Sequence, residues 1–160
     1  MSIQKIPYIN FDYLINKMKQ ELNEAFNEVF NSGMFILGQN VTKFENEIAD
    51  YCQAKFAGGV SNGTSALILG LKALGITASH SFVSSASDIA LVGAVPVLAD
   101  SSVDSYNIDP QSIKSKITSK TKAIMPVHMT GRACNIIEIN KIAEENGLFV
   151  IEDAAQSIGA

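Results

Sequence analysis

The sequence has no long apolar run. No stretch of its 160 residues approaches the ~20 consecutive apolar residues that a membrane-spanning helix needs. The N-terminus turns polar within a few residues, so it lacks the apolar core of a secretory signal. We therefore expect no membrane partner and a cytoplasmic location.

Positive charge and cysteine are also scarce. Lys and Arg number 12 against 16 Asp and Glu, and the net charge of −4 gives no electrostatic reason to expect nucleic acid as a partner. The densest basic group, from Lys114 to Lys122, is typical of a solvated helix face and turn. Cys52 and Cys134 lie far apart without the spacing of metal ligands, so we expect two reduced thiols and no metal site.

What the sequence does contain is typical of one globular domain. Apolar residues make up 47% and charged residues 18%, an ordinary composition for a folded protein. A chain of 160 residues is long enough for one hydrophobic core. There are no internal repeats, low-complexity tracts or linkers, so we expect one domain over residues 1–160.

Apolar residues at helical spacing alternate with short apolar runs along the chain. Helices are predicted over residues 13–30, 41–51, 66–74, 84–92, 110–117 and 136–146, and strands over residues 56–60, 95–99, 122–127 and 148–151. Gly33 and Gly147 suit helix ends, and Asp109-Pro110 suits a helix start. Segment 66–74 is apolar all round, so we expect it to be buried on every side. The alternation predicts an α/β fold with three layers, α/β/α, around a mostly parallel central sheet.

Two acidic residues, Glu152 and Asp153, directly follow the predicted strand over residues 148–151. In an open α/β sheet, the residues just past the carboxyl end of a strand line the ligand crevice. Gln156 comes three residues after Asp153, so both side chains face one way if a helix or turn begins there. The alternative is that Asp153 caps a helix, which is the more frequent outcome for this motif taken alone.

Another predicted strand leads into the segment Ser61-Asn62-Gly63-Thr64-Ser65. The free N–H groups and the positive dipole end of a helix starting there would form an anion site, especially for phosphate. The segment lacks the Lys of a P-loop and the three glycines of a dinucleotide fingerprint, so neither nucleotide motif fits. A plain helix cap with a turn glycine explains the local pattern equally well.

Two more side chains near strand ends are candidates. Phe82 stands among small polar residues and could stack on a flat cofactor ring, although such a Phe is more often part of the core. His128 could contact a substrate, although a hydrogen-bonded structural histidine is the commoner outcome, and we expect His80 to be structural. An anion site, a stacking aromatic and a strand-end carboxylate together suit pyridoxal phosphate. Its phosphate must be held, its ring sandwiched and its ring nitrogen kept protonated by an Asp.

Six segments carry a more specific signal. They are SGMFILGQNVTKFENEIADYC, SNGTSAL, LVGAVPVLAD, YNIDP, TKAIMPVHMTGRACN and VIEDAAQSIGA. In order and spacing they resemble the DegT/DnrJ/EryC1/StrS family of sugar aminotransferases, and they cover nearly the whole chain. The resemblance implies an aspartate-aminotransferase-like large domain of fold type I, with residues 1–160 as its N-terminal part and the C-terminal small domain absent.

The resemblance also implies a cofactor, a set of site residues and a reaction. Gly63, Thr64 and Ser65 would hold the phosphate of pyridoxal phosphate, and Phe82 would stack on its ring. Asp153 would pair with the ring nitrogen, and Gln156 would contact the ring hydroxyl. The family transfers an amino group, usually from glutamate, to a keto sugar linked to a nucleoside diphosphate, for polysaccharide or antibiotic sugars. A few relatives catalyse a dehydration instead. Members are homodimers whose active sites use residues from both chains.

Two features depart from the family pattern. The catalytic lysine that forms the Schiff base lies beyond EDAAQ in the family, and none of the eleven lysines here has a matching context. Between Gly75 and Phe82 the chain is too short for a turn and a typical strand of ~5–6 residues, so we expect a sheet that is missing one strand. The chain alone is therefore expected to be inactive. A non-catalytic remnant and a phosphate- or pyridoxal-phosphate-binding module with other chemistry stay open as alternatives.

Overall fold

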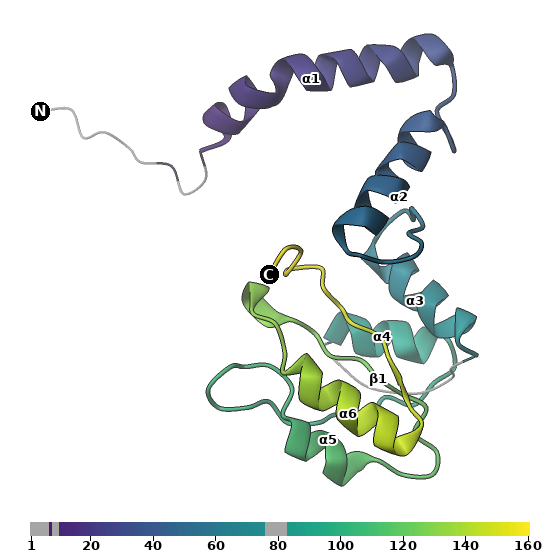
Figure 1. The fold of residues 1–160 in the computed structure, drawn as a ribbon, viewed down its shortest axis with the longest axis vertical. Coiled ribbons are helices and arrows are strands. Elements are labelled where there is room, and N and C mark those ends of the chain that lie inside the picture. The colour runs from purple at the N-terminus through teal and green to yellow at the C-terminus, as the bar shows by residue number, and fades with distance from the viewer. Residues whose placement is uncertain (1–6, 8–9, 76–82) are drawn as a thin grey trace, which may run out of the picture. The chain divides into compact units, whose positions relative to one another are not determined.

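The computed structural model of the protein describes residue 7, residues 10–75 and residues 83–160 (Figure 1). Phe82 and the short segment after Gly75 lie outside the described residues. Contacts within the chain divide it into two compact units, Met1–Gly59 (unit 1) and Val60–Ala160 (unit 2). Among the helices that the structure describes, none is both long and apolar enough to cross a membrane.

Unit 1 contains two helices, α1 (Phe11–Ser32) and α2 (Gln39–Tyr51), where the periodicity predicts them. Asn10 caps α1, since its Oδ1 atom accepts the N–H of Tyr13 at 3.1 Å. Gly33 ends α1 with a φ of +66°, the left-handed conformation that glycine adopts without strain. Neither helix contains a buried residue, so unit 1 by itself does not fully cover its apolar side chains.

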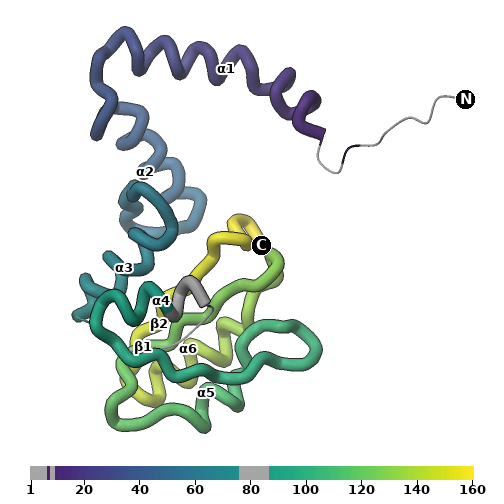
Figure 2. The backbone as a smooth tube through the Cα atoms, turned by 180° about the vertical axis from the view of Figure 1, so that it is seen from behind, coloured from purple at the N-terminus to yellow at the C-terminus, as the bar shows by residue number. Residues whose placement is uncertain are grey.

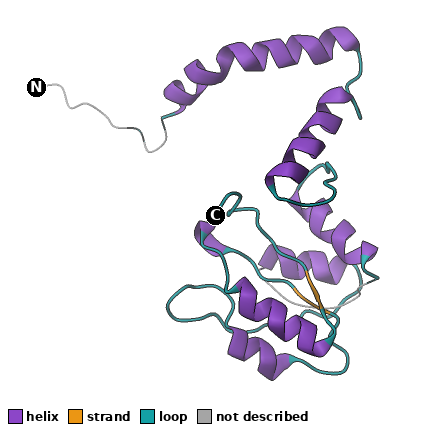
Figure 3. Cartoon of the chain, viewed as in Figure 1, coloured by secondary structure: helices purple, strands orange, loops and turns teal. Residues whose placement is uncertain are grey.

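Unit 2 alternates helices with two short strands (Figure 3). Its elements are α3 (Gly63–Ala73), α4 (Val83–Leu91), α5 (Pro110–Lys116), β1 (Ala123–Ile124), the 3₁₀ helix η1 (Met129–Gly131), α6 (Ile136–Asn146) and β2 (Phe149–Val150). The predicted start of α5 is confirmed, because the Asp109 carboxylate accepts the N–H groups of Gln111 and Ser112. Gly147 ends α6 with a φ of +63°, also as predicted.

The two strands lie side by side and run parallel (Figure 2). Ala123 pairs with Phe149 and Ile124 with Val150, and a parallel bridge between Val127 and Asp153 continues the pairing. The bridge is made by two hydrogen bonds: the His128 N–H donates to the Asp153 carbonyl at 3.1 Å, and the Asp153 N–H donates to the Pro126 carbonyl at 2.9 Å. Asp153 is thus held by its backbone at the carboxyl end of the sheet.

The strands predicted over residues 56–60 and 95–99 do not form, so those two predictions are wrong. A strand exists only where a neighbouring strand exchanges backbone hydrogen bonds with it. In the described part of the chain, β1 and β2 pair with each other, and neither segment has a strand beside it. Both segments keep apolar side chains exposed, among them Phe56 at 79% and Leu98 at 66%.

The side chains of β1 enter two different hydrophobic clusters. The first cluster comprises Leu71, Ile89, Ala94, Ala123 and Met125. The second comprises Ile113, Ile124, Cys134, Ile139, Ile142 and Ala143. Because successive strand residues point to opposite faces, α3 and α4 cover one face of the strand pair and α5 and α6 the other. The predicted three-layer α/β/α arrangement is therefore confirmed within unit 2.

Helix α3 is less buried than its sequence predicts. Leu71 is its one buried residue, and Leu69 is 54% exposed. The expectation that this helix is covered on every side is therefore wrong. Its buried Leu71 packs in the first cluster against Ile89 of α4 and Ala123 of β1.

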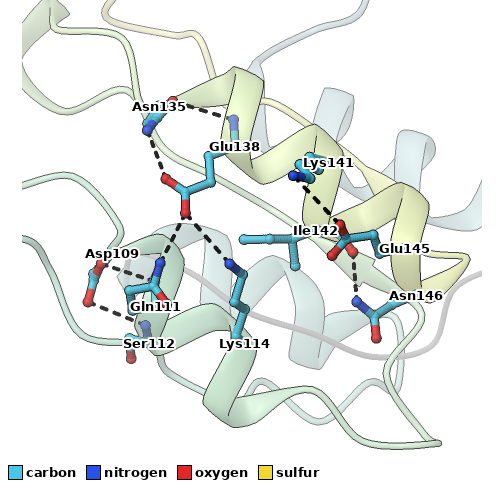
Figure 4. Close-up of polar contacts among 10 residues, drawn as sticks. All are labelled: Asp109, Gln111, Ser112, Lys114, Asn135, Glu138, Lys141, Ile142, Glu145 and Asn146. Carbon is cyan, nitrogen blue, oxygen red and sulfur yellow. Dashed lines mark hydrogen bonds and ion pairs between the residues drawn. The ribbon is translucent and has the colours of Figure 1, made fainter.

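Polar contacts join α5 to α6 on the outer layer (Figure 4). Glu138 of α6 accepts a hydrogen bond from the Gln111 amide at 3.0 Å and lies 3.7 Å from the Lys114 ammonium. Asn135 caps α6 through the Glu138 N–H. These exposed contacts fix the register of two helices whose apolar faces already meet in the second cluster.

Candidate functional site

The start of α3 has a capped first turn. The Asn62 Oδ1 atom accepts the N–H of Ser65 at 2.8 Å, and the hydroxyls of Ser61 and Ser65 are 3.1 Å apart. The helix-cap alternative for this segment is thus confirmed for Asn62. The cap leaves the N–H groups of Gly63 and Thr64, which have no partner within the helix, at its positive end. A cap and an anion site are therefore compatible here.

A residue that the sequence analysis did not single out lies beside Thr64. Asp88 of α4 is only 4% exposed, and the Thr64 side chain lowers the pKa of its carboxyl group. Its Oδ2 atom is buried and has no hydrogen-bond partner among the described residues. Burial, and then the negative charge of Asp153, raise the pKa of Asp88, while the Thr64 side chain opposes the rise.

Asp153 follows β2 and is half-buried. Its Oδ1 atom accepts the Ala155 N–H at 3.3 Å, so the side chain stabilises a turn. No helix follows among the described residues, which form turns from residue 154 onward. The alternative that Asp153 caps a helix is therefore wrong.

Gln156 contacts the turn that follows β1. Its Oε1 atom accepts the Thr130 N–H at 2.9 Å. Gly131 has a φ of +81°, and a side chain there would place its Cβ 3.2 Å from the Gln156 carbonyl oxygen. The close approach therefore suits glycine. With the amide oxygen engaged, the amide NH2 of Gln156 is the end that can donate to a ligand oxygen.

His128 is buried, and both of its ring nitrogens are hydrogen-bonded. The Cys134 N–H donates to Nδ1 at 3.1 Å, so Nδ1 carries no proton in this arrangement. Nε2 lies 2.9 Å from Glu152 Oε2 and carries the ring proton that it donates. A substrate contact by His128 would have to replace one of these bonds. The structure thus ties His128 to the two segments that follow β1 and β2.

The Cys134 thiol belongs to the same network. It donates to the Val127 carbonyl at 3.2 Å, and burial raises its pKa. Both cysteines are free, Cys52 exposed and Cys134 buried.

The described residues named from the sequence thus fall into three groups. Gly63, Thr64 and Ser65 form the first turn of α3, Asp153 and Gln156 follow β2, and His128 follows β1. Phe82 lies outside the described residues. Asp88, whose pKa responds to Thr64 and Asp153, was missed, although an aspartate directly before the apolar Ile89 and Ala90 of a predicted helix is a usable signal.

Two curated relatives of the chain are, by name, aminotransferases of nucleotide-linked sugars. The chain is 43% identical over 162 residues to dTDP-3-amino-3,6-dideoxy-alpha-D-galactopyranose transaminase of Aneurinibacillus thermoaerophilus, covering 97% of this chain and 45% of that protein. It is 39% identical over 162 residues to UDP-2-acetamido-2-deoxy-3-oxo-D-glucuronate aminotransferase of Pseudomonas aeruginosa, with the same shares covered. The chain thus spans less than half the length of these relatives.

Two solved structures have folds similar to that of this chain. DesV of S. venezuelae, in complex with a ketimine intermediate, matches with a TM-score of 0.92 at 31% identity, over 97% of this chain and 44% of that one. NtdA of Bacillus subtilis, with bound cofactor PMP, matches with a TM-score of 0.90 at 33% identity, over 99% and 38%. The expected fold class is confirmed, and the bound PMP confirms a pyridoxal-type cofactor in a structure of this kind. Residues 16–160 match the model of the DegT/DnrJ/EryC1/StrS aminotransferase family, and the chain therefore belongs to that family.

Proposed function

We propose that this chain is the cofactor-binding part of a pyridoxal-phosphate-dependent aminotransferase that acts on a keto sugar linked to a nucleoside diphosphate, with glutamate as the amino donor. One observation carries the proposal beyond family membership. Thr64 of α3 and Asp153 after β2 both affect the pKa of the same buried residue, Asp88. This supports the presence of a hydroxyl beside a helix N-terminus and a strand-end carboxylate near each other, as a phosphorylated, nitrogen-containing ring requires.

The phosphate would be held at the first turn of α3. Its donors would be the N–H groups of Gly63 and Thr64 and the hydroxyl of Ser65. A Cβ added at Gly63 would meet nothing within 4 Å, so the described surface beside this residue is open. The positive end of the helix dipole adds a favourable interaction with an anion, typically about 0.3–1 kcal/mol at an exposed site. The donor set fits a phosphate group.

The ring would be held at the carboxyl end of the sheet. Asp153 would pair with the protonated ring nitrogen, the Gln156 NH2 would donate to the ring hydroxyl, and Phe82 would stack on the ring. When bound, pyridoxal phosphate supplies an electron sink for chemistry at an amine carbon. The charge on Asp153 would keep the ring nitrogen protonated, because an opposite charge nearby favours the ionised form.

We infer that the 160 residues bind the cofactor but do not complete the reaction alone. Transamination needs a lysine for the Schiff base and for proton transfer, and no lysine here stands in a matching context. The proposal includes a homodimer, supported by the uncovered apolar side chains of α1. It also keeps the cytoplasmic location, which suits two free thiols.

Binding of pyridoxamine phosphate to the 160-residue chain tests the site. This probe carries the phosphate, the ring nitrogen and the ring hydroxyl, but it has no aldehyde to react with surface lysines. We expect saturable binding by calorimetry, weakened by about tenfold or more in Asp153→Asn, since one ordinary pKa unit of differential interaction corresponds to tenfold. Asp104→Asn, an exposed aspartate in a loop, is the matched control and should bind as the original chain does. Absence of binding would contradict the proposed site.

The substrate class needs a second experiment on the complete gene product. We expect repeated turnover of glutamate to 2-oxoglutarate, beyond the amount released by a single loading of the cofactor, only when a keto sugar linked to a nucleoside diphosphate is present. Binding of pyridoxamine phosphate without any amino transfer by that product would favour the binding-module alternative. Loss of water from the sugar, detected by mass spectrometry, would favour a dehydratase.

A further inference from the structure

Asn107 is a buried polar residue that has no role in the proposed function. It is 2% exposed, and the Ser102 N–H donates to its carbonyl at 2.8 Å, which fixes its backbone. Its side chain makes two hydrogen bonds to the turn that follows β1. Oδ1 accepts the Met129 N–H at 3.0 Å, and Nδ2 donates to the Arg132 carbonyl at 2.9 Å. One amide group thus holds both ends of this turn, with its acceptor at one end and its donor at the other.

The backbone between these two bonds is strained. Thr130 has a φ of +55°, and Gly131 has a φ of +81°. Glycine adopts the left-handed conformation without cost, but for a β-branched residue such as threonine it is unfavourable. A conformation of this kind persists only where the surrounding contacts impose it. The two bonds from the buried Asn107 side chain are such contacts.

The same turn contacts the site residues that follow β2. The Thr130 N–H donates to Gln156 Oε1 at 2.9 Å, and the His128 N–H donates to the Asp153 carbonyl at 3.1 Å. A relaxed turn, with a negative φ at Thr130, would redirect the backbone that carries the first of these bonds. The orientation of the Gln156 amide therefore depends on the strained form of the turn.

We propose that Asn107 is a positioning residue of this site: by holding Met129 and Arg132 it keeps the turn in the form that orients the Gln156 amide for the ring hydroxyl of the cofactor. The proposal rests on the proposed function, because Gln156 is assigned there to that hydroxyl. Asn107 acts through the turn and not by contact with the cofactor.

Two ligands separate this role from a merely structural one. They are pyridoxamine phosphate and its analogue without the ring hydroxyl, each measured by calorimetry. We expect the original chain to prefer the first by about fivefold, as one hydrogen bond allows. Gln156→Ala and Asn107→Ala should each remove that preference. The double variant should show the same preference as Gln156→Ala alone, because both changes remove one interaction.

Ile139→Ala is the matched control for lost stability. Ile139 is fully buried in the second cluster, so the change destabilises unit 2 without removing a bond to the turn. We expect it to weaken both ligands equally and to keep the fivefold preference. A preference that survives in Asn107→Ala, or that Ile139→Ala also removes, would overturn the proposal.

Hydrogen exchange in the ligand-free chain tests the turn directly. In the original chain we expect the N–H groups of Met129 and Thr130 to be protected to the same extent, because one opening of the turn exposes both. Asn107→Ala should speed the exchange of both by about tenfold or more, whereas Gln156→Ala should speed that of Thr130 only. Unequal protection in the original chain, which needs no variant to fold, or full protection of Thr130 in Asn107→Ala would overturn the proposal. If the chain fails to bind pyridoxamine phosphate, the proposed function fails, while this exchange still decides whether Asn107 holds the turn.

Discussion

Unit 1 and unit 2 both contain amphipathic helices, but only unit 2 buries them. The helices α1 and α2 have no buried residue, whereas α3, α5 and α6 each contribute buried residues to clusters around the strand pair. Full burial of one large aliphatic side chain contributes about 1.5–3 kcal/mol. The difference teaches that unit 2 has its own core, whereas unit 1 taken by itself leaves the apolar row of its helices uncovered.

The largest expected effect comes from removing a core side chain of unit 2. Ile139 is fully buried, so Ile139→Ala should lower the free energy of unfolding by about 2–5 kcal/mol. Phe26 of α1 is 66% exposed, and Phe26→Ala should change it by less than about 0.5 kcal/mol. Urea unfolding followed by circular dichroism measures both. Equal losses would mean that the two units are packed alike.

The next effect concerns the exposed apolar row of α1, which contains Leu22 and Phe26. If a second copy covers this row, the double change Leu22→Ser with Phe26→Ser should weaken self-association by about tenfold or more, as loss of a buried anchor does. The exposed Gln20 lies two positions before Leu22, away from the row, so Gln20→Ser should leave self-association unchanged. Sedimentation velocity over a concentration series gives the answer. A chain that is monomeric at every concentration would refute the homodimer.

A smaller effect is expected where His128 joins the segments after β1 and β2. His128→Leu leaves the Cys134 N–H without its acceptor, and the free energy of unfolding should fall by about 1–3 kcal/mol. Glu152→Gln is the matched control, because a glutamine oxygen still accepts from Nε2 and should keep the value within about 0.5 kcal/mol. A large loss in Glu152→Gln would instead indicate that His128 is charged.

The smallest effect compares the two asparagine caps. Asn62→Ala should lower the free energy of unfolding of unit 2 by about 1 kcal/mol, because Ser65 loses its acceptor. Asn10→Ala removes an equivalent bond to Tyr13, but α1 has no buried residue to lose, so only local fraying is expected. Hydrogen exchange at the first turns of α1 and α3 distinguishes the two. A larger effect at α1 would reverse the comparison.

Helix positions could be predicted from the sequence because their signals are local. The 3.6-residue spacing, the glycines at positions 33 and 147 and the Asp109 cap each depend on a few neighbouring residues, and all were confirmed. Strands over residues 56–60 and 95–99 were predicted wrongly, because a strand depends on a partner that an apolar run cannot specify. The burial of α3 was overestimated for the same reason, since apolar character does not show which side has a neighbour.

The candidate site was predictable in part. Strand ends that turn polar directed attention to Thr64 and Asp153, and both affect the pKa of Asp88. Asp88 itself was missed because a single aspartate in a helix is usually solvated, and its burial follows from packing against α3 and the strand pair. The candidate contact of His128 with a substrate depended on free ring nitrogens, and the sequence could not show that the Cys134 backbone and Glu152 occupy them.

One titration tests most directly whether the two halves of the site act together. Nitrogen-15 NMR of the 160-residue chain, with increasing pyridoxamine phosphate, reports each backbone amide separately. We predict that the amides of Gly63, Thr64 and Asp153 shift together along one saturation curve, while those of α1 and α2 stay in place. Shifts at the start of α3 and after β2 that follow different curves, or the absence of any saturable shift, would contradict a single site for a phosphorylated ring.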